Sequence, residues 1–67
     1  MHRTFDYVNK MGFRRTLTVE KNSNGKYTVT ISNRDTKRAL NTPVEWTTEQ
    51  LNYFLKEMKA KERNKNG

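Results

Sequence analysis

The sequence predicts an α+β fold, in which an antiparallel β-meander of three to four strands carries one C-terminal α-helix on one face. Two patterns support this prediction. Apolar and polar residues alternate over residues 13–20 and again over 26–32, with a glycine-containing gap between the runs, as in a β-hairpin with one buried face. From residue 51 the apolar residues recur instead at the i, i+3, i+4, i+7 spacing of an amphipathic helix.

The central hairpin has a register that the alternation itself decides. A three-residue loop over 23–25 pairs Asn22 with Lys26 and sets Val19 opposite Val29. A two-residue loop would shift the pairing by one residue, and one strand would then turn its apolar side chains to water. The loop ends in a glycine, which accepts the left-handed backbone conformation that closes such loops. We therefore expect the odd-numbered side chains of both strands on one buried face.

A shorter strand is expected before this hairpin. Residues 4–8 carry alternating aromatic side chains, and the segment 10–12 again ends in glycine before the next strand. The same kind of three-residue loop then sets Phe5 opposite Leu17, which brings the aromatic side chains onto the buried face.

The segment after the hairpin is predicted as an edge strand. Turn-forming residues at 33–36 separate it from the hairpin. Residues 37–42 are short and basic, with Leu40 directed inward, and charged edge strands discourage aggregation. Pro43 is expected to end this strand because proline cannot donate to a sheet.

The helix has a well-marked beginning. Thr47 is the predicted N-cap, and Gln50 follows at the spacing of a capping box. Trp46 and Leu51 occupy the positions of a hydrophobic staple around this cap. Beyond residue 58 the apolar stripe stops, so residues 60–67 are expected to fray as a basic tail.

These elements predict a single small domain over residues 1–67 with one apolar core. A chain of this length buries only about 60% of its unfolded surface, so its stability is marginal and homodimerisation is one way to increase it. The predicted core consists of Phe5, Tyr7, Phe13, Leu17, Val19, Tyr27, Val29, Ile31, Leu40, Trp46, Leu51, Phe54, Leu55 and Met58.

The composition argues against several classes of protein. The chain has no cysteine, which excludes disulfides and thiolate metal sites. Its apolar runs are much shorter than the roughly 20 residues that cross a membrane. We expect a cytoplasmic protein without a metal, a cofactor or a membrane partner.

Catalysis is not expected either. The one histidine, His2, lies in a terminal segment, whereas a general base must be held in place. The carboxylates lie on different predicted elements without a spacing that pairs them, and no phosphate-binding loop or nucleophile motif occurs. The sequence therefore predicts a protein that is not an enzyme.

The charge indicates the kind of partner. Fourteen Lys and Arg residues against seven Asp and Glu residues give a formal net charge of +7, which attracts polyanions and nucleic acid in particular. On the outer sheet face and in the 33–38 loop, basic side chains alternate with threonines, and both types can contact phosphates or base edges in a major groove. The candidate binding residues are Arg14, Thr16, Lys26, Thr28, Arg34, Lys37 and Arg38.

The favoured hypothesis is a small non-catalytic nucleic-acid-binding or regulatory protein, with DNA preferred over RNA. Over residues 13–62 the order of elements resembles the arm-site DNA-binding domains of phage-type integrases and the plant ethylene-response DNA-binding domain. The resemblance is one of architecture, and the Gly-Phe that usually leads into the helix is replaced here by Pro43-Val44-Glu45-Trp46. The alternative is an interaction module or inhibitor that binds an acidic partner protein, where positive charge would speed association.

Overall fold

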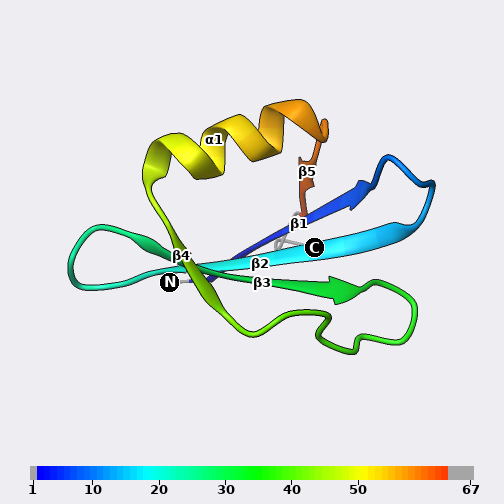
Figure 1. The fold of residues 1–67 in the computed structure, drawn as a ribbon, viewed down its shortest axis with the longest axis horizontal. Helices are drawn as coiled ribbons and strands as arrows, with labels where there is room; N and C mark the ends of the chain where they lie inside the picture. Colours follow the sequence, from blue (N-terminus) through cyan, green and yellow to red (C-terminus); the bar gives the residue numbers. More distant parts are fainter. Residues whose placement is uncertain (1, 64–67) are drawn as a thin grey trace.

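A computed structural model describes residues 2–63 as an antiparallel sheet with one helix across one face (Figure 1). The strand order is β4-β3-β2-β1-β5, so β1 to β4 form a meander and the chain returns from the helix to add β5 beside β1. The α+β class and the meander are confirmed, and the described sheet has five strands where three or four were predicted. The elements are β1 (His2–Val8), β2 (Arg14–Lys21), β3 (Tyr27–Asn33), β4 (Val44–Trp46), α1 (Thr48–Glu57) and β5 (Lys61–Glu62).

Both hairpins have the predicted register. Val19 pairs with Val29 across β2 and β3, and Phe5 pairs with Leu17 across β1 and β2. The loops close as three-residue connections, and the glycine at the end of each has a positive φ, 87° at Gly12 and 83° at residue 25. The alternation of apolar residues was therefore sufficient to determine which side chains face the helix.

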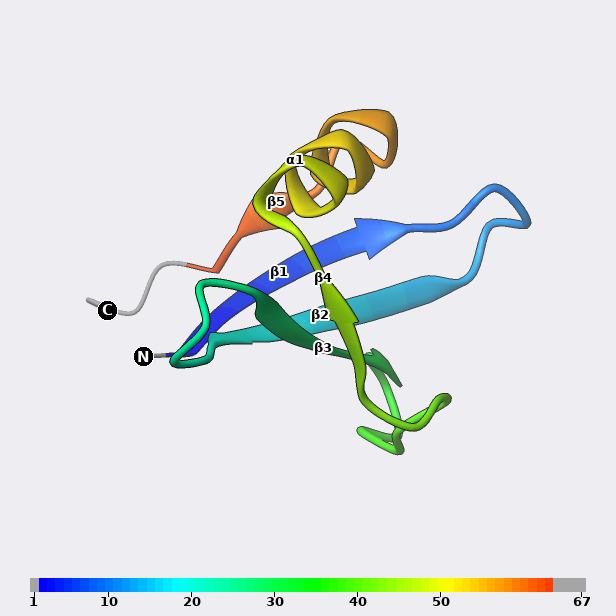
Figure 2. The same cartoon turned by 60° about the vertical axis from the view of Figure 1, so that its left-hand side comes forward.

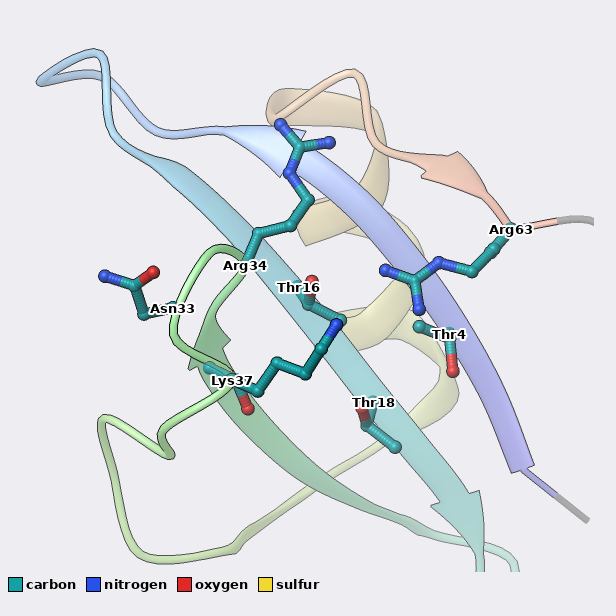
Figure 3. A pocket seen from close by; sticks show the side chains of 8 residues that line it. Thr4, Thr16, Thr18, Asn33, Arg34, Lys37 and Arg63 are labelled. Carbon is teal, nitrogen blue, oxygen red and sulfur yellow. The ribbon is translucent and has the colours of Figure 1, made fainter.

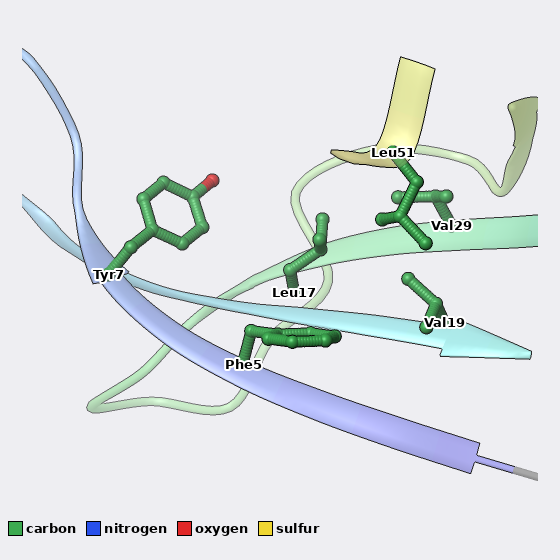
Figure 4. Packing of buried hydrophobic residues seen from close by; sticks show 6 residues of the cluster. All are labelled: Phe5, Tyr7, Leu17, Val19, Val29 and Leu51. Carbon is green, nitrogen blue, oxygen red and sulfur yellow. The ribbon is translucent and has the colours of Figure 1, made fainter. Parts of the chain in front are cut away.

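The core lies between the sheet and α1 and draws its side chains from the odd-numbered positions of three strands. Leu17 and Val29 have no exposed surface, and Leu51 of the helix is 1% exposed. Phe54 packs edge-on against Tyr7 with 5.3 Å between ring centroids. Figure 4 shows the six buried side chains of this cluster, Phe5, Tyr7, Leu17, Val19, Val29 and Leu51.

The helix begins as predicted, with both hydrogen bonds of a capping box. The Gln50 amide donates to Thr47 Oγ1 at 3.1 Å, and the Thr47 amide donates to Gln50 Oε1 at 2.9 Å. Trp46 lies at the end of β4 and packs against Phe54, with 5.1 Å between ring centroids. The cap therefore connects the sheet directly to the packed face of α1 (Figure 2).

The predicted edge strand over 37–42 is wrong. The chain makes only an isolated bridge to β3 there, between Ser32 and Ala39, and Leu40 is 50% exposed instead of inward. The Asn41 side-chain oxygen accepts the Ile31 amide at 2.7 Å, so a side chain takes the hydrogen bond that a strand backbone would have made. Strand pairing resumes after Pro43, as β4.

Phe13 is also not a core residue. It precedes β2 at the end of the sheet and is 50% exposed. Arg15 covers one face of its ring, with Cζ 5.2 Å from the centroid. The alternation extended one residue beyond the part of the sheet that α1 covers.

The tail does not fray from residue 60 as predicted. Lys59 has a φ of 53°, and the Ala60 amide donates to the Leu55 carbonyl at 3.0 Å. These are the features of a Schellman motif, which reverses the chain at a helix end. The reversal directs residues 61–62 into β5, where they pair with β1. The rest of the predicted tail, residues 64–67, lies outside the described residues.

Candidate functional site

A depression of about 200 Å³ lies on the outer face of the sheet, on the side opposite α1 (Figure 3). Its position follows from the register, because the even-numbered side chains of β1, β2 and β3 point away from the core. The lining residues come from β1, β2, the end of β3 with the loop after it, and the residue that follows β5: Thr4, Thr16, Thr18, Ser32, Asn33, Arg34, Lys37 and Arg63.

The floor of the depression consists of small hydroxyl side chains. Thr4 pairs with Thr18 across β1 and β2, and Thr16 pairs with Ser32 across β2 and β3. Thr16 is only 9% exposed, so neighbouring side chains rise above it. A hydroxyl both donates and accepts hydrogen bonds, and this floor can therefore bind a polar group that approaches from solvent.

One wall of the depression is the loop between β3 and the bridge at residue 39. The Asn33 side-chain oxygen accepts the amides of Asp35 and Thr36 at 2.9 and 3.1 Å, and the Lys37 amide donates to the Asn33 carbonyl at 2.7 Å. Lys37 itself has a φ of 65°, a left-handed conformation that costs roughly 1–2 kcal/mol for a residue with a Cβ. The loop is thus held by its own hydrogen bonds, and it keeps a lysine where glycine or asparagine would be favoured.

Both Arg34 and Lys37 line the depression from this loop, and Lys37 extends over the floor. Figure 3 shows the Lys37 side chain reaching across β2 beside Thr16, and the Arg34 side chain directed toward β1. Arg34 Nε is buried and has no hydrogen-bond partner among the described residues. A buried N–H of a charged group without an acceptor is costly.

The opposite wall is Arg63, which follows β5 and points back across the depression (Figure 3). Its Nη2 donates to Asp6 Oδ1 at 2.7 Å and its Nε donates to Asp6 Oδ2 at 3.2 Å. The hydrogen bonds from Arg63 hold the pKa of Asp6 below its ordinary value, against the opposing effect of burial, with further help from the Thr16 hydroxyl and the charge of Arg34. Asp6 therefore stays ionised and balances part of the positive charge.

We call Arg34, Lys37 and Arg63, together with the hydroxyl floor beneath them, the cationic cradle. Three cations from two separate segments line a depression that carries one adjacent carboxylate, Asp6. Hydroxyl, ammonium and guanidinium donors are the groups that bind phosphate and sulfate oxygens. No cluster of three metal-binding side chains occurs within residues 2–63.

The structure brings together three of the seven predicted site residues: Thr16, Arg34 and Lys37 all line the cradle. Arg14 is paired with Asp35 beside it, and Arg38 is exposed where the loop rejoins β3.

The other two predicted residues lie apart from the cradle. Lys26 precedes β3 whereas Arg34 follows it, so the two lie at opposite ends of that strand. Thr28 pairs with Glu20 on one side and Glu45 on the other. This end of the outer face is therefore partly acidic.

Sequence reasoning missed the contribution of Arg63 and of the hydroxyls at Thr4, Thr18 and Ser32. The hydroxyls follow from the confirmed register, in which they share a face with Thr16. Arg63 was assigned to a frayed tail. Asp6 could have indicated that a cation lies nearby. The register sets this carboxylate on the outer face beside Thr16, where a cationic partner stabilises it.

Comparison with known proteins gives no family for this chain. No family model, no curated protein and no solved structure matches it. Within residues 2–63, α1 is too short and too polar to cross a membrane.

Proposed function

We propose that this protein is a small non-catalytic nucleic-acid-binding protein that holds a backbone phosphate in the cationic cradle, with DNA as the favoured partner. The observation that carries the proposal is that Arg34, Lys37 and Arg63 all line one hydroxyl-floored depression, with Lys37 and Arg63 reaching over it from opposite sides. Like charges repel one another, so a fold that gathers three of them around a polar depression gains most when an anion binds there.

The surroundings of the cradle support a polyanion over a single small anion. Lys10 and Arg38 lie at the same end of the sheet as Arg34 and Lys37. A backbone that crosses this end would meet about four cations in succession. For duplex DNA, that number of phosphate contacts gives a slope of about −4 in a plot of log affinity against log salt concentration.

The chain offers a matched pair of variants for testing the cradle. Lys37 and Lys59 both have a positive φ. A glycine at either position therefore removes one positive charge and also removes the strain of a side chain in the left-handed backbone conformation. Lys37 lines the cradle, whereas Lys59 lies at the C-terminal end of α1. Any difference between Lys37→Gly and Lys59→Gly in binding therefore reports on position and not on net charge or backbone strain.

Fluorescence anisotropy with labelled duplex DNA, single-stranded DNA and RNA, over a range of salt concentrations, is the measurement. Lys37→Gly should make the salt slope less steep by about 0.9, the value of one lost phosphate contact, and Lys59→Gly should leave it unchanged. Circular dichroism checks that both variants stay folded. Equal slopes for the two variants, or no salt-dependent binding of any of the three nucleic acids by the wild-type protein, would refute the proposal.

A second candidate function is binding to an acidic partner protein. The edge formed by β4 and the segment before it favours this candidate, because Leu40 and Val44 are 50% and 42% exposed there, and Arg38 lies beside them in the chain. Pull-down with Leu40→Ser and wild-type bait separates the two functions. A stoichiometric protein partner that depends on Leu40, together with a flat anisotropy response, would favour the second one.

A further inference from the structure

The β1–β2 loop exposes apolar side chains at the end of the sheet that also carries the cradle. Met11 is 78% exposed, and Val8 and Phe13 are each 50% exposed. Three of the six large apolar side chains that are exposed among the described residues therefore fall within residues 8–13. Figures 1 and 2 both show this loop projecting beyond the end of α1, so the helix does not cover it.

The loop is held in one conformation by its own hydrogen bonds. The Asn9 side-chain oxygen accepts the amides of Met11 and Phe13 at 3.0 and 2.9 Å, and the Gly12 amide donates to the Asn9 carbonyl at 2.9 Å. A rigid loop loses little conformational entropy when it binds a partner. The backbone that carries the exposed Met11, at the tip of the hairpin, is thus already ordered before a partner binds.

The charges around the tip indicate the partner. Residues 8–15 and 33–38 contain six Lys and Arg residues and one carboxylate, Asp35, which is paired with Arg14. Apolar side chains surrounded by cations fit a partner that is anionic outside and apolar within. A duplex has this character, because its phosphates enclose stacked bases, and proteins that bend DNA insert apolar side chains between base steps.

We propose that the β1–β2 loop is a wedge that inserts Met11 between base pairs of duplex DNA and bends it, while the cradle holds the backbone nearby. This proposal rests on the proposed function. Thr16 follows Phe13 by three residues and Thr18 follows it by five. These separations correspond to about 10–16 Å along a strand. At 3.4 Å per base pair, the wedge therefore enters roughly three to five base pairs from the held phosphate.

The test measures affinity and DNA shape separately. A duplex of about 20 base pairs with a flexible TA step, labelled at both ends, reports bending by energy transfer, and anisotropy reports binding. The variants are Met11→Ser, which removes the apolar wedge, and Met11→Leu, which keeps it. Tyr53→Ser is the matched control, because Tyr53 is 68% exposed on α1, away from the tip.

Wild-type protein, Met11→Leu and Tyr53→Ser should all increase energy transfer on binding. Met11→Ser should bind about tenfold more weakly, with the salt slope unchanged and the bend lost. Salt-dependent binding without bending, or bending that survives Met11→Ser, would overturn the wedge and leave the cradle intact. Absence of duplex binding would overturn the wedge, and absence of binding to single-stranded DNA and RNA as well would overturn both proposals. Met11-dependent binding to phosphatidylglycerol vesicles, with no change in duplex shape, would instead identify an anionic membrane as the partner and overturn the wedge.

Discussion

Asp6→Asn is expected to strengthen nucleic-acid binding, although it removes an ion pair from the structure. In the folded protein the Asp6 carboxylate accepts two hydrogen bonds from Arg63 and one from Thr16. It therefore occupies donors that a phosphate would otherwise use. Neutralising this carboxylate releases the full charge of Arg63 into the cradle.

The size of the effect follows from the number of phosphate contacts. One more cation available to the backbone steepens the salt slope by about 0.9. A fourfold decrease in salt, from about 200 to about 50 mM, then raises the affinity of Asp6→Asn by about 3.5-fold more than that of the wild-type protein. Anisotropy titrations with the same labelled duplex at these two salt concentrations measure this difference directly.

Glu62→Gln is the matched control for this experiment. Glu62 pairs with Arg3 through two hydrogen bonds of 3.0 Å, and its register opposite Phe5 sets it on the helix-covered face. The two variants change the net charge equally, and each removes a carboxylate that pairs with an arginine in or beside the β1–β5 pair. If Asp6→Asn binds no better than Glu62→Gln while both are folded, the carboxylate does not compete with the ligand and this interpretation of the cradle is wrong.

The pH dependence of stability tests the same ion pair. The pKa of Asp6 is lower in the folded protein than its ordinary value of 3.8, chiefly because of the hydrogen bonds from Arg63. The stabilisation is therefore present above about pH 4 and is lost as the pH falls through the folded pKa. The difference between the urea midpoints of wild-type protein and Asp6→Asn should be present at pH 7 and shrink as the pH falls through the lowered pKa of Asp6. A difference that grows on acidification would contradict the assignment.

Three substitutions test the fold. Leu51→Ala should destabilise the protein by about 2–5 kcal/mol, since Leu51 is 1% exposed, and this loss is comparable to the whole stability of a domain of this size, roughly 0.05–0.15 kcal/mol per residue. Thr47→Ala should cost about 1 kcal/mol through the lost capping box. Gly25→Ala should cost about 1–2 kcal/mol, because φ is 83° and no atom lies within 4 Å of the added Cβ, so backbone conformation alone sets the cost. Urea denaturation followed by circular dichroism measures all three.

Tyr53→Ala is the control for the helix substitutions, because its side chain is 68% exposed and such surface changes usually stay within about 0.5 kcal/mol. A loss at Leu51→Ala no larger than at Tyr53→Ala would mean that α1 does not pack on the sheet as described. A Gly25→Ala variant as stable as the wild-type protein would mean that the loop closes with a different backbone conformation.

The sequence predicted correctly those parts of the fold for which a local sequence pattern allows only one arrangement. The register of β1 to β3 follows from period-two alternation and from a glycine at the end of each loop, and the start of α1 follows from Thr47 and Gln50. The edge strand was misplaced because Asn41 satisfies a β3 amide with its side chain. The residue type alone does not show that a side chain will replace the backbone as the hydrogen-bond acceptor.

The largest omission, β5, has a different physical cause. A helix end that reverses through a Schellman motif usually has glycine in the left-handed position, and here that position is Lys59. Nothing in the local sequence therefore marked the reversal. The missing third cation of the site was a consequence, because Arg63 reaches the cradle only after the chain has turned back along β1.

The same dependence links binding to folding. Arg63 donates its amide to the Thr4 carbonyl at 2.7 Å and its guanidinium to Asp6, so the cradle is complete only when β5 is paired with β1. A ligand that binds the complete cradle must then stabilise the β1–β5 pairing by mass action. Amide hydrogen exchange at Arg63 should accordingly slow when a polyanion is added, whereas exchange at the α1 amides should change only as much as global stability does. Slowing at the α1 amides without slowing at Arg63 would place the anion elsewhere on the protein.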